Sequence, residues 1–534
     1  MATTEGYAPL KAEDGDDVLD SPTLPVKPLS RRRRFIPLLL SALGGAVLFA
    51  AAHAVTPAST WPGDVGFEQL QQAANASCSP LPTPVVDIAC PAAVQATTCG
   101  ISSDLLDEFG SHNFRLSQVH VGSGYRIQKV LAKAQRGEKV RIGVIGGSVS
   151  LGHGTHPETG RRFAYGAIPV EEQWHQYVRR YIASIAGVEP DFVNGAIAAT
   201  DSTFFEWCYV EAIGTDLDLV MVEMAVNDEY SDGMESSENL LRSLLQLPSQ
   251  PAVLYADSFA LRSEQQVKAL LNGQDLQNSL ASFYDVAQIS ARPALLPAMI
   301  RNNLLEGPLF KGDPRHVTTL GHRFIGSMIV GYLQEEACRA QVSVEKEEEQ
   351  KDEAEDRRKG KRALGRPEGW AWPDAETLGQ VPKVKMNEAW NARVKHGSAP
   401  PTCQIAGKAL KPVEMPADWT LYDWKKTKYY YETKVPNSQP IVFEATIPRG
   451  GAGSIALSYL RSSNADYHLG LALCTAGTQS ATLDGRWESS RSVPQSAVIA
   501  RDLPAGKHRV ECRTLEPREG ETQTAFRIVG VMTA

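Results

Sequence analysis

Between residues 112 and 340, compact apolar runs alternate with longer amphipathic segments. The runs are short and almost wholly apolar, as in strands buried on both faces of a parallel sheet, and they are 139–147, 191–197, 217–225 and 252–257. The amphipathic segments have a helical period, and they are 170–185, 235–247 and 319–340. Strands that alternate with helices predict a three-layer α/β/α domain of the flavodoxin-like type, with a parallel sheet.

The pattern changes after residue 402, where long helical periods are missing. Short apolar runs separated by glycine and proline turns take their place, at 441–447, 454–459, 469–474 and 526–532. This texture predicts an all-β sandwich over residues 403–534. Residues 341–402 include a dense block of charges that nearly cancel, which favours a charged linker or solvated helix over a partner-binding arm.

The N-terminal region predicts the topology of the chain. Residues 1–34 are polar and end in four arginines, Arg31 to Arg34, and are expected to form a disordered cytoplasmic tail. Residues 35–55 contain no charged side chain, and a helix of that length spans about 30 Å, the thickness of a bilayer core. The positive-inside rule then predicts a single-pass type II membrane protein in the Golgi or ER lumen or at the cell surface. The alternative is a secreted protein, cleaved after Ala52-His53-Ala54.

Residues 56–111 are predicted to form a lumenal stalk that carries Cys78, Cys90 and Cys99. In an oxidising compartment Asn75, in Asn-Ala-Ser, becomes a candidate glycosylation site.

Eight cysteines suffice for three or four disulfides. Cys474 and Cys512 both lie in predicted strands of the β domain and are the favoured pair there. Because the stalk holds an odd number of cysteines, one of them should pair with a cysteine of the later domains. The candidates are Cys208, Cys338 and Cys403.

Composition narrows the functional classes. The 534 residues carry a net charge of −8, and the basic residues are scattered apart from two runs, which argues against a nucleic-acid partner. Gly143, Gly146 and Gly147 have the wrong spacing for a dinucleotide turn, and no phosphate-binding loop motif is present. His153 and His156 have no ligand partners at metal-site spacing and are interpreted as loop residues. We therefore expect neither a metal nor a cofactor.

Candidate chemistry gathers where predicted strands end, and these ends share one edge of a parallel sheet. Ser148 follows two glycines and is expected at the N-terminus of a helix, Gly195 ends the next strand, and Asn227 follows the third. Asp313 precedes His316 by three residues on a turn, a spacing that lets a carboxylate bond the Nδ1–H of the ring.

In this order the four sites resemble the blocks of the SGNH (GDSL-like) hydrolase superfamily, over about residues 112–340. The matching segments are IGGSVSLG, NGAIAAT, AVND and DPRHVTTLGH. Gly147 stands where the family usually has Asp, and Ala225 where it usually has Gly, so the subfamily and the substrate stay open.

The resemblance implies acyl transfer through a covalent serine intermediate, without metal or cofactor. Ser148 would be the nucleophile, His316 its general base, and Asp313 the group that orients the imidazole. The oxyanion hole would consist of the backbone N–H groups of Ser148 and Gly195 and the side-chain amide of Asn227.

Together these features predict an SGNH-type serine esterase that acts on acyl esters, chiefly acetyl esters of glycans, in the secretory pathway. A polysaccharide O-acetyltransferase is the first alternative, because the anchor, stalk and motif order are similar to those of trichome birefringence-like acetyltransferases. A catalytically silent glycan-binding protein and a lipid esterase are the others, and the oligomeric state is open. Several aromatic residues of the β domain could stack on sugars or simply pack the core: Trp419, Tyr422, Trp424, Tyr429, Tyr430, Tyr431 and Trp487.

Overall fold

The computed structural model describes residues 100–534 with short gaps, and the residues left out within this range are 161, 164–167, 229–233, 262–270, 361–376, 378, 393–396, 398, 425–427, 488–491 and 522–523. The expected cytoplasmic tail, the membrane anchor and the glycosylation site at Asn75 lie outside the described residues. Among the helices that are described, none is both long and apolar enough to cross a membrane.

A six-stranded sheet forms the centre of the first domain, in the order β1-β8-β7-β6-β2-β5. All neighbouring strands are parallel except β1, which runs antiparallel to β8 at one edge. The strands are β1 (Gln118–His120), β2 (Arg141–Gly146), β5 (Asp191–Asn194), β6 (Leu219–Glu223), β7 (Ala252–Asp257) and β8 (Ala287–Ser290). The four apolar runs of the sequence correspond to β2, β5, β6 and β7, so the predicted parallel sheet is confirmed.

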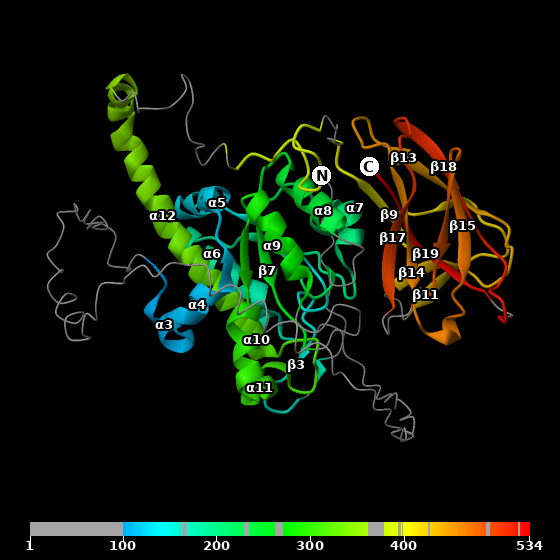
Figure 1. The fold of residues 1–534 in the computed structure, drawn as a ribbon, viewed down its shortest axis with the longest axis horizontal. Helices are drawn as coiled ribbons and strands as arrows, with labels where there is room; N and C mark the ends of the chain where they lie inside the picture. Colours follow the sequence, from blue (N-terminus) through cyan, green and yellow to red (C-terminus); the bar gives the residue numbers. More distant parts are fainter. Residues whose placement is uncertain are drawn as a thin grey trace, which may run out of the picture. The chain divides into compact units, whose positions relative to one another are not determined.

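Helices cover both faces of this sheet (Figure 1). One layer consists of α5 (Tyr125–Gln135), α6 (Trp174–Ala186) and α12 (Thr319–Gly360), and the other of α7 (Ser202–Ile213), α8 (Met234–Leu245) and α9 (Gly273–Phe283). The remaining elements of this domain are α3 (Ser103–Phe109), α4 (Ser111–Ser117), β3 (Gly154–Thr155), β4 (Arg162–Phe163), η1 (Val170–Glu172), α10 (Arg292–Arg301), η3 (Asn303–Leu305) and α11 (Glu306–Phe310).

Each helical layer has its own hydrophobic core against the sheet. Trp174 of α6 and Phe324 of α12 pack with Val144 on one face. Phe205 of α7 and Val220 of β6 belong to the core on the other. Burying a side chain of this size stabilises the fold by about 1.5–3 kcal/mol.

The segment after the first domain is more ordered than a simple linker. Helix α12 continues past the predicted end at residue 340 to Gly360, into the charged block. Further on, the chain is tied to the first domain. The carbonyl oxygen of Gly379 accepts hydrogen bonds from Arg126. That of Val384 accepts one from Arg242, at 3.1 Å.

The C-terminal domain is a sandwich of two antiparallel sheets, as the sequence predicts (Figure 1). One sheet has the order β10-β13-β18-β15-β16, and the other has β11-β12-β19-β14-β17, with β9 paired to β19. Their bounds are β9 (Thr402–Ile405), β10 (Pro412–Glu414), β11 (Thr420–Trp424), β12 (Lys428–Thr433), β13 (Ile441–Ile447), β14 (Ile455–Arg461), η4 (Ala465–Tyr467), β15 (Leu471–Ala476), β16 (Gln479–Asp484), β17 (Val493–Ala500), β18 (Gly506–Thr514) and β19 (Phe526–Thr533).

Two disulfides join described residues. Cys474 and Cys512 face each other across β15 and β18 and are bonded, which confirms the predicted pair. Cys208 of α7 is bonded to Cys403 of β9 and thereby links the two domains. Cys338 is disulfide-bonded as well, to a cysteine outside the described residues.

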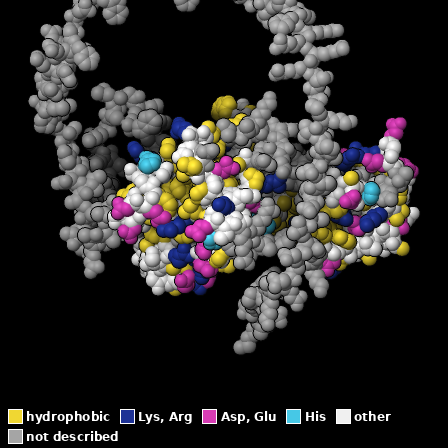
Figure 2. Space-filling view, turned by 90° about the horizontal axis from the view of Figure 1, so that it is seen from below, with side chains coloured by type: hydrophobic (Ala, Val, Ile, Leu, Met, Phe, Trp, Pro, Cys, Tyr) yellow, Lys and Arg dark blue, Asp and Glu magenta, His cyan; other side chains and the backbone are white. Residues whose placement is uncertain are grey.

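The two domains also meet through side chains. Ala456 and Met532 of the sandwich belong to the same apolar cluster as Cys208 of α7. Gln495 of β17 donates a hydrogen bond to the hydroxyl of Thr203, at 3.3 Å. The sandwich therefore packs against α7, which begins directly after the loop that follows β5. Figure 2 shows acidic and basic side chains interspersed over the visible face of the described residues.

Candidate active site

Ser148 lies on a tight turn directly after β2. A Cβ atom on Gly147 would lie 2.3 Å from Oδ1 of Asn227, so a side chain at this position would displace the Asn227 carboxamide.

The expected helix after Ser148 is wrong. The chain makes a short turn instead, with hydrogen bonds from the N–H of Leu151 to the carbonyl of Gly147 (3.1 Å) and from that of His153 to the carbonyl of Ser148 (2.9 Å). It then enters the small β3–β4 hairpin. The apolar period after the turn is too short to carry a helix.

A buried carboxyl group supports this turn from below. Glu223, at the end of β6, accepts hydrogen bonds from the Ser150 hydroxyl (3.0 Å) and the Ser258 hydroxyl (2.6 Å). It also accepts from the backbone N–H groups of Ser150 and Gly147. Burial raises the pKa of Glu223 to about 7, although these hydrogen bonds lower it. The sequence analysis missed this residue, because a single Glu at the end of an apolar run has no distinctive spacing.

Asp313 and His316 form the second half of the site, on the turn before α12. Oδ2 of Asp313 lies 2.9 Å from Nδ1 of His316, and Oδ1 accepts the backbone N–H groups of Arg315 and His316. Burial raises the pKa of Asp313, but the hydrogen bond and charge of His316 and the backbone donors bring it down to about 2. The carboxylate is therefore ionised across the physiological pH range and fixes the imidazole ring.

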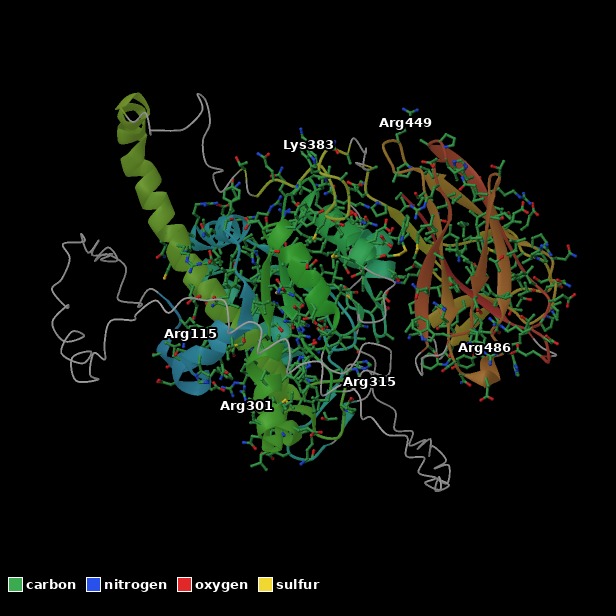
Figure 3. All side chains as sticks on the ribbon, viewed as in Figure 1. Arg115, Arg301, Arg315, Lys383, Arg449 and Arg486 are labelled. Carbon is green, nitrogen blue, oxygen red and sulfur yellow. A yellow bond between two sulfur atoms is a disulfide. The ribbon has the colours of Figure 1, made fainter. Side chains whose placement is uncertain are left out.

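The structure brings the predicted nucleophile and base together. Oγ of Ser148 lies 2.8 Å from Nε2 of His316, across 168 residues of sequence. The His316 and Asp313 side chains are 19% and 14% exposed, so a substrate can reach the base while the carboxylate is held from behind. Arg315 marks this turn in Figure 3, at the same end of the domain as β3 and α11.

Asn227 occupies the position expected of an oxyanion donor. Its side chain is 4% exposed and lies against Gly147, next to the nucleophile. Within the described part of the chain, neither its carboxamide nor the N–H of Ser148 makes a hydrogen bond. The next residue, Asp228, is fully buried and accepts bonds from the N–H and hydroxyl of Ser202. Asp228 thus ties the Asn227 turn to the start of α7.

The predicted role of Gly195 is wrong. Its N–H donates to the carbonyl of Val144, at 2.9 Å, as an extension of the sheet, and so cannot face an oxyanion. Gly195 is glycine for a different reason, because a Cβ atom there would meet Cγ2 of Ile213 at 2.7 Å. The N–H groups of the next two residues are also occupied, by Asn194 and by Gly146.

Further along the same loop, Ala199 has a φ of 58°, in the left-handed region that residues with a Cβ rarely adopt. Its N–H and that of Ala198 make no hydrogen bond to any described residue. Strained backbone next to an active site is a recurring feature of binding loops. This loop therefore offers Ala198 and Ala199 as candidate oxyanion donors in place of Gly195.

His153 also belongs to the site, although the sequence placed it among loop residues. Its ring centroid lies 5.4 Å from that of His316. Burial, followed by the charge of His316, lowers the pKa of His153 to about 4, so it is neutral at pH 7. The described residues contain no group of three or more His, Cys, Asp or Glu arranged to hold a metal ion.

Comparison with known proteins supports the fold. No family model matches the sequence, and no curated protein matches it either. A two-domain esterase active on acetylated mannans, crystallised with mannopentaose, aligns over 79% of this chain and 98% of its own, with a TM-score of 0.51 at 17% identity. A second structure of an esterase so described aligns with the same coverage at 16% identity. An acetylxylan esterase from Geobacillus stearothermophilus aligns over 36% of this chain and 94% of its own, at 15% identity and a TM-score of only 0.23. The chain therefore has the fold of an α/β domain followed by a β-sandwich, as in the two-domain esterase.

Proposed function

We propose that this protein is a serine esterase that removes acyl groups, chiefly acetyl, from glycans. One observation carries the proposal: Ser148, His316 and Asp313 form a continuous hydrogen-bonded relay beside the side-chain amide of Asn227, which makes no hydrogen bond to a described residue. This is the arrangement that acyl transfer to serine requires.

The relay suits both proton transfers of the reaction. Nε2 of His316 takes the proton of the Ser148 hydroxyl as Oγ attacks the ester carbonyl carbon. Asp313 holds the Nδ1–H and stabilises the imidazolium that forms. His316 then returns the proton to the departing sugar oxygen, so that the C–O bond breaks and an acyl-serine is left.

The negative charge on the tetrahedral intermediate is stabilised by donors that are already in place. Among the described residues, neither the amide of Asn227 nor the N–H of Ser148 has an acceptor, so neither gives up such a hydrogen bond when the oxyanion forms. Such preorganised donors contribute about 3–4 kcal/mol each to transition-state stabilisation. A water molecule, deprotonated by His316, attacks the acyl-serine and releases the carboxylic acid.

A glycan substrate is favoured by the domain arrangement. The neighbour that shares both domains acts on acetylated mannans. The sandwich carries aromatic side chains on the face that packs against the catalytic domain, where sugar rings could stack.

We place the catalytic region in the secretory pathway, behind a type II anchor at residues 35–55. The four arginines before this charge-free segment and the disulfides in both domains support the placement, because disulfides persist in oxidising compartments. Protease added to intact microsomes should spare residues 56–534, and digestion of that region without detergent would contradict the orientation.

Release of acetate by the purified lumenal region from acetylated mannan, acetylated xylan and a triacylglycerol tests the reaction. We expect release from the polysaccharides and labelling of Ser148 by a fluorophosphonate probe. The Ser148→Ala variant is the negative control for both measurements. Absence of labelling would favour a silent glycan-binding protein, and release from the triacylglycerol alone would indicate a lipid esterase.

The same relay could pass the acyl group to a sugar hydroxyl, so an acceptor series separates hydrolase from transferase. The enzyme receives an activated acetyl ester with increasing amounts of unacetylated oligosaccharide. We expect acetate release to be independent of the acceptor. A fall in acetate that matches the gain in acetylated sugar would show that the protein is an acetyltransferase.

A further inference from the structure

Asn194 ends β5, and its side chain bonds to both segments that flank the candidate oxyanion hole. Its Nδ2 donates to the carbonyl oxygen of Ser150, at 2.8 Å, in the turn that carries Ser148. Its Oδ1 accepts the backbone N–H of Ala196, at 3.1 Å, in the loop that follows β5. A carboxamide offers a donor and an acceptor at once, so a single orientation of this side chain satisfies both contacts. Asn194 therefore links the turn to the loop.

The two bonds of Asn194 differ in what explains them. The bond from Ala196, two residues further on, closes a local turn of the kind that Asn forms readily at the end of a strand. The bond to Ser150 spans 44 residues of sequence and joins two different strand ends. Local turn formation therefore accounts for the first bond but not for the second.

Ser150 is a rigid attachment point for this link. It is fully buried, and its hydroxyl donates to Glu223 (3.0 Å) and accepts the indole N–H of Trp174 (3.1 Å). Its carbonyl oxygen also lies 3.1 Å from Nε2 of His175. Burial lowers the pKa of His175 to about 4, although the bond to Ser150 raises it, so the ring is neutral at pH 7 and has one N–H to donate. Asn194 is thus tied to a fixed point two residues after the candidate nucleophile.

The loop after β5 is attached at its far end as well. The N–H and the hydroxyl of Ser202 donate to the carboxyl group of Asp228. Residues 195–201 are therefore held at their start by Asn194 and at their end by Asp228. Between these attachments lie the two alanines that are candidate oxyanion donors, and Ala199 has the left-handed φ of 58°. Such a conformation persists only where the surrounding structure fixes it.

Backbone hydrogen bonds alone do not fix this loop against the turn. The parallel pairing of β2 with β5 ends at Val144 and Asn194, and the N–H of Ile197 then donates to the carbonyl of Gly146, at 3.0 Å. Among the described residues, no backbone bond joins the loop beyond Ile197 to the turn at 147–153. Donors from two segments must nevertheless be placed to within about 0.5 Å of each other to bind one oxyanion. The side chain of Asn194 supplies a connection that the backbone lacks.

We infer that Asn194 is a positioning residue of the candidate active site, which holds the loop of Ala198 and Ala199 in register with the turn of Ser148. This inference rests on the proposed serine esterase function and adds a residue to it. Asn194 acts through the loop and the turn rather than on the substrate. Its loss should therefore lower kcat, which depends on the oxyanion, and leave binding of the unreacted ester nearly unchanged.

Kinetics on a small acetyl ester test this role. Asn194→Ala should lower kcat by about 10²-fold, because a misplacement of about 1 Å has an effect of this size, and KM should change little. Asn239→Ala is the matched control, since the amide of Asn239 on α8 donates to Glu206 at 2.8 Å. The control should lower stability and keep the parent's kcat. Parental kcat in Asn194→Ala, or equal losses of kcat in both variants, would overturn the inference.

A carboxyl group at this position gives a pH readout that a purely structural role would not move. Asn194→Asp keeps an acceptor for the N–H of Ala196, but only the protonated acid can donate to the carbonyl of Ser150. The ratio of the variant's kcat to the parent's should therefore rise by about tenfold as the pH falls from about 8 to about 5. Taking the ratio removes the titration of His316, which both enzymes share. A ratio that is independent of pH would contradict the link.

Hydrogen exchange separates this inference from the proposed function, because it needs no turnover. In Asn194→Ala, the backbone N–H groups of residues 195–201 should exchange about tenfold faster than in the parent, since the loop opens more often. In Asn239→Ala the same segment should exchange at the parent's rate. Faster exchange confined to Asn194→Ala supports the link even if the parent hydrolyses no ester. Unchanged exchange contradicts it even if the parent is an active esterase.

Discussion

The two domains place their polar side chains in different parts of a sheet. The catalytic sheet is buried on both faces by helices, so its chemistry is confined to the strand ends, where Ser148 and Asn227 lie. The sheet of the sandwich that contains β12, β14 and β19 packs one face against the other sheet. Its outer face packs partly against α7 and carries aromatic residues such as Tyr422 and Tyr430 along the strands. We therefore look for functional side chains at one edge of the sheet in the first domain and along one face of the sheet in the second.

The domains also bury carboxyl groups differently. Glu223 of the catalytic domain has only hydroxyl and N–H donors around it, and burial raises its pKa to about 7. Glu432 of the sandwich is paired with Arg527, and the two side chains are only 6% and 7% exposed. Stability should therefore depend on pH through the first group and on an intact ion pair through the second.

The largest expected effect concerns the catalytic edge. Ser148→Ala and His316→Ala should each lower kcat by about 10⁴-fold or more, and the double variant should lose little further, because the two groups act as a unit. His156→Ala, in the same loop region, is the matched control and should retain activity. Acetate release by Ser148→Ala at the parent's rate would refute the assignment of the edge.

Breaking the buried pair tests the sandwich. Arg527→Met leaves Glu432 with the exposed Lys434, 3.9 Å away, as its cationic partner among the described residues, so its buried charge is poorly compensated. We therefore expect a loss of about 3–5 kcal/mol in the free energy of unfolding. Denaturant titration of the parent and the variant measures it. Arg509→Met, which removes exposed ion pairs with Glu414 and Glu511 on the other sheet, should change stability far less than Arg527→Met, because water screens exposed charges. Equal effects of the two variants would contradict the distinction between buried and exposed pairs.

Removal of an oxyanion donor should have the next largest effect. Asn227→Ala should reduce kcat by about 10²–10³-fold and leave KM for a small ester nearly unchanged, because the donor acts on the transition state. Gly195→Ala should instead reduce stability by about 1–3 kcal/mol through overpacking, with kcat of the folded enzyme retained. If Gly195→Ala removed activity without loss of stability, Gly195 would return as a candidate donor.

The pH dependence of stability tests the raised pKa of Glu223. Below pH 4.5 Glu223 is protonated in both the folded and the unfolded chain and contributes no difference. Between pH 4.5 and about 7 only the unfolded chain releases the proton, so this residue lowers stability as the pH rises. Between pH 4.5 and about pH 8, the free energy of unfolding of Glu223→Gln should therefore rise relative to that of the parent by up to about 3 kcal/mol. Thermal unfolding at several pH values measures this difference. A difference that is constant with pH would show that Glu223 ionises freely in the folded protein.

The smallest effect concerns backbone strain. Ala199→Gly relieves a left-handed conformation and should stabilise the fold by about 1 kcal/mol. Ala198→Gly, at a neighbouring residue without positive φ, should destabilise it by about 0.5–1 kcal/mol. The sign of the difference between the two variants in denaturant titrations is the measured quantity.

Much of the catalytic domain could be predicted, because parallel strands produce compact apolar runs and their ends must share an edge. This is why Ser148 and His316 could be paired across a long separation. The role of Gly195 could not be predicted, since whether its N–H bonds Val144 depends on strand register. Ala199 gave no signal, because alanine is compatible with almost any local structure.

In the sandwich, the alternation of Tyr429, Tyr430 and Tyr431 was predictable, but not which face would meet the catalytic domain. The cross-strand pair Cys474–Cys512 was found because both residues sit within apolar strand runs. The link between Cys208 and Cys403 has no local pattern, because it depends on how α7 and β9 pack.

The link between the domains has a consequence for biosynthesis. Its cysteines are separated by 195 residues, which a ribosome needs roughly 10–40 s to translate at about 5–20 residues per second. During that interval the catalytic domain has been synthesised, but Cys208 on α7 cannot yet pair with Cys403. The thiol must be protected or transiently paired until the first strand of the sandwich appears. The protein would therefore complete its maturation only after synthesis of the C-terminal domain, and a truncated chain would leave the first domain with a free thiol at Cys208.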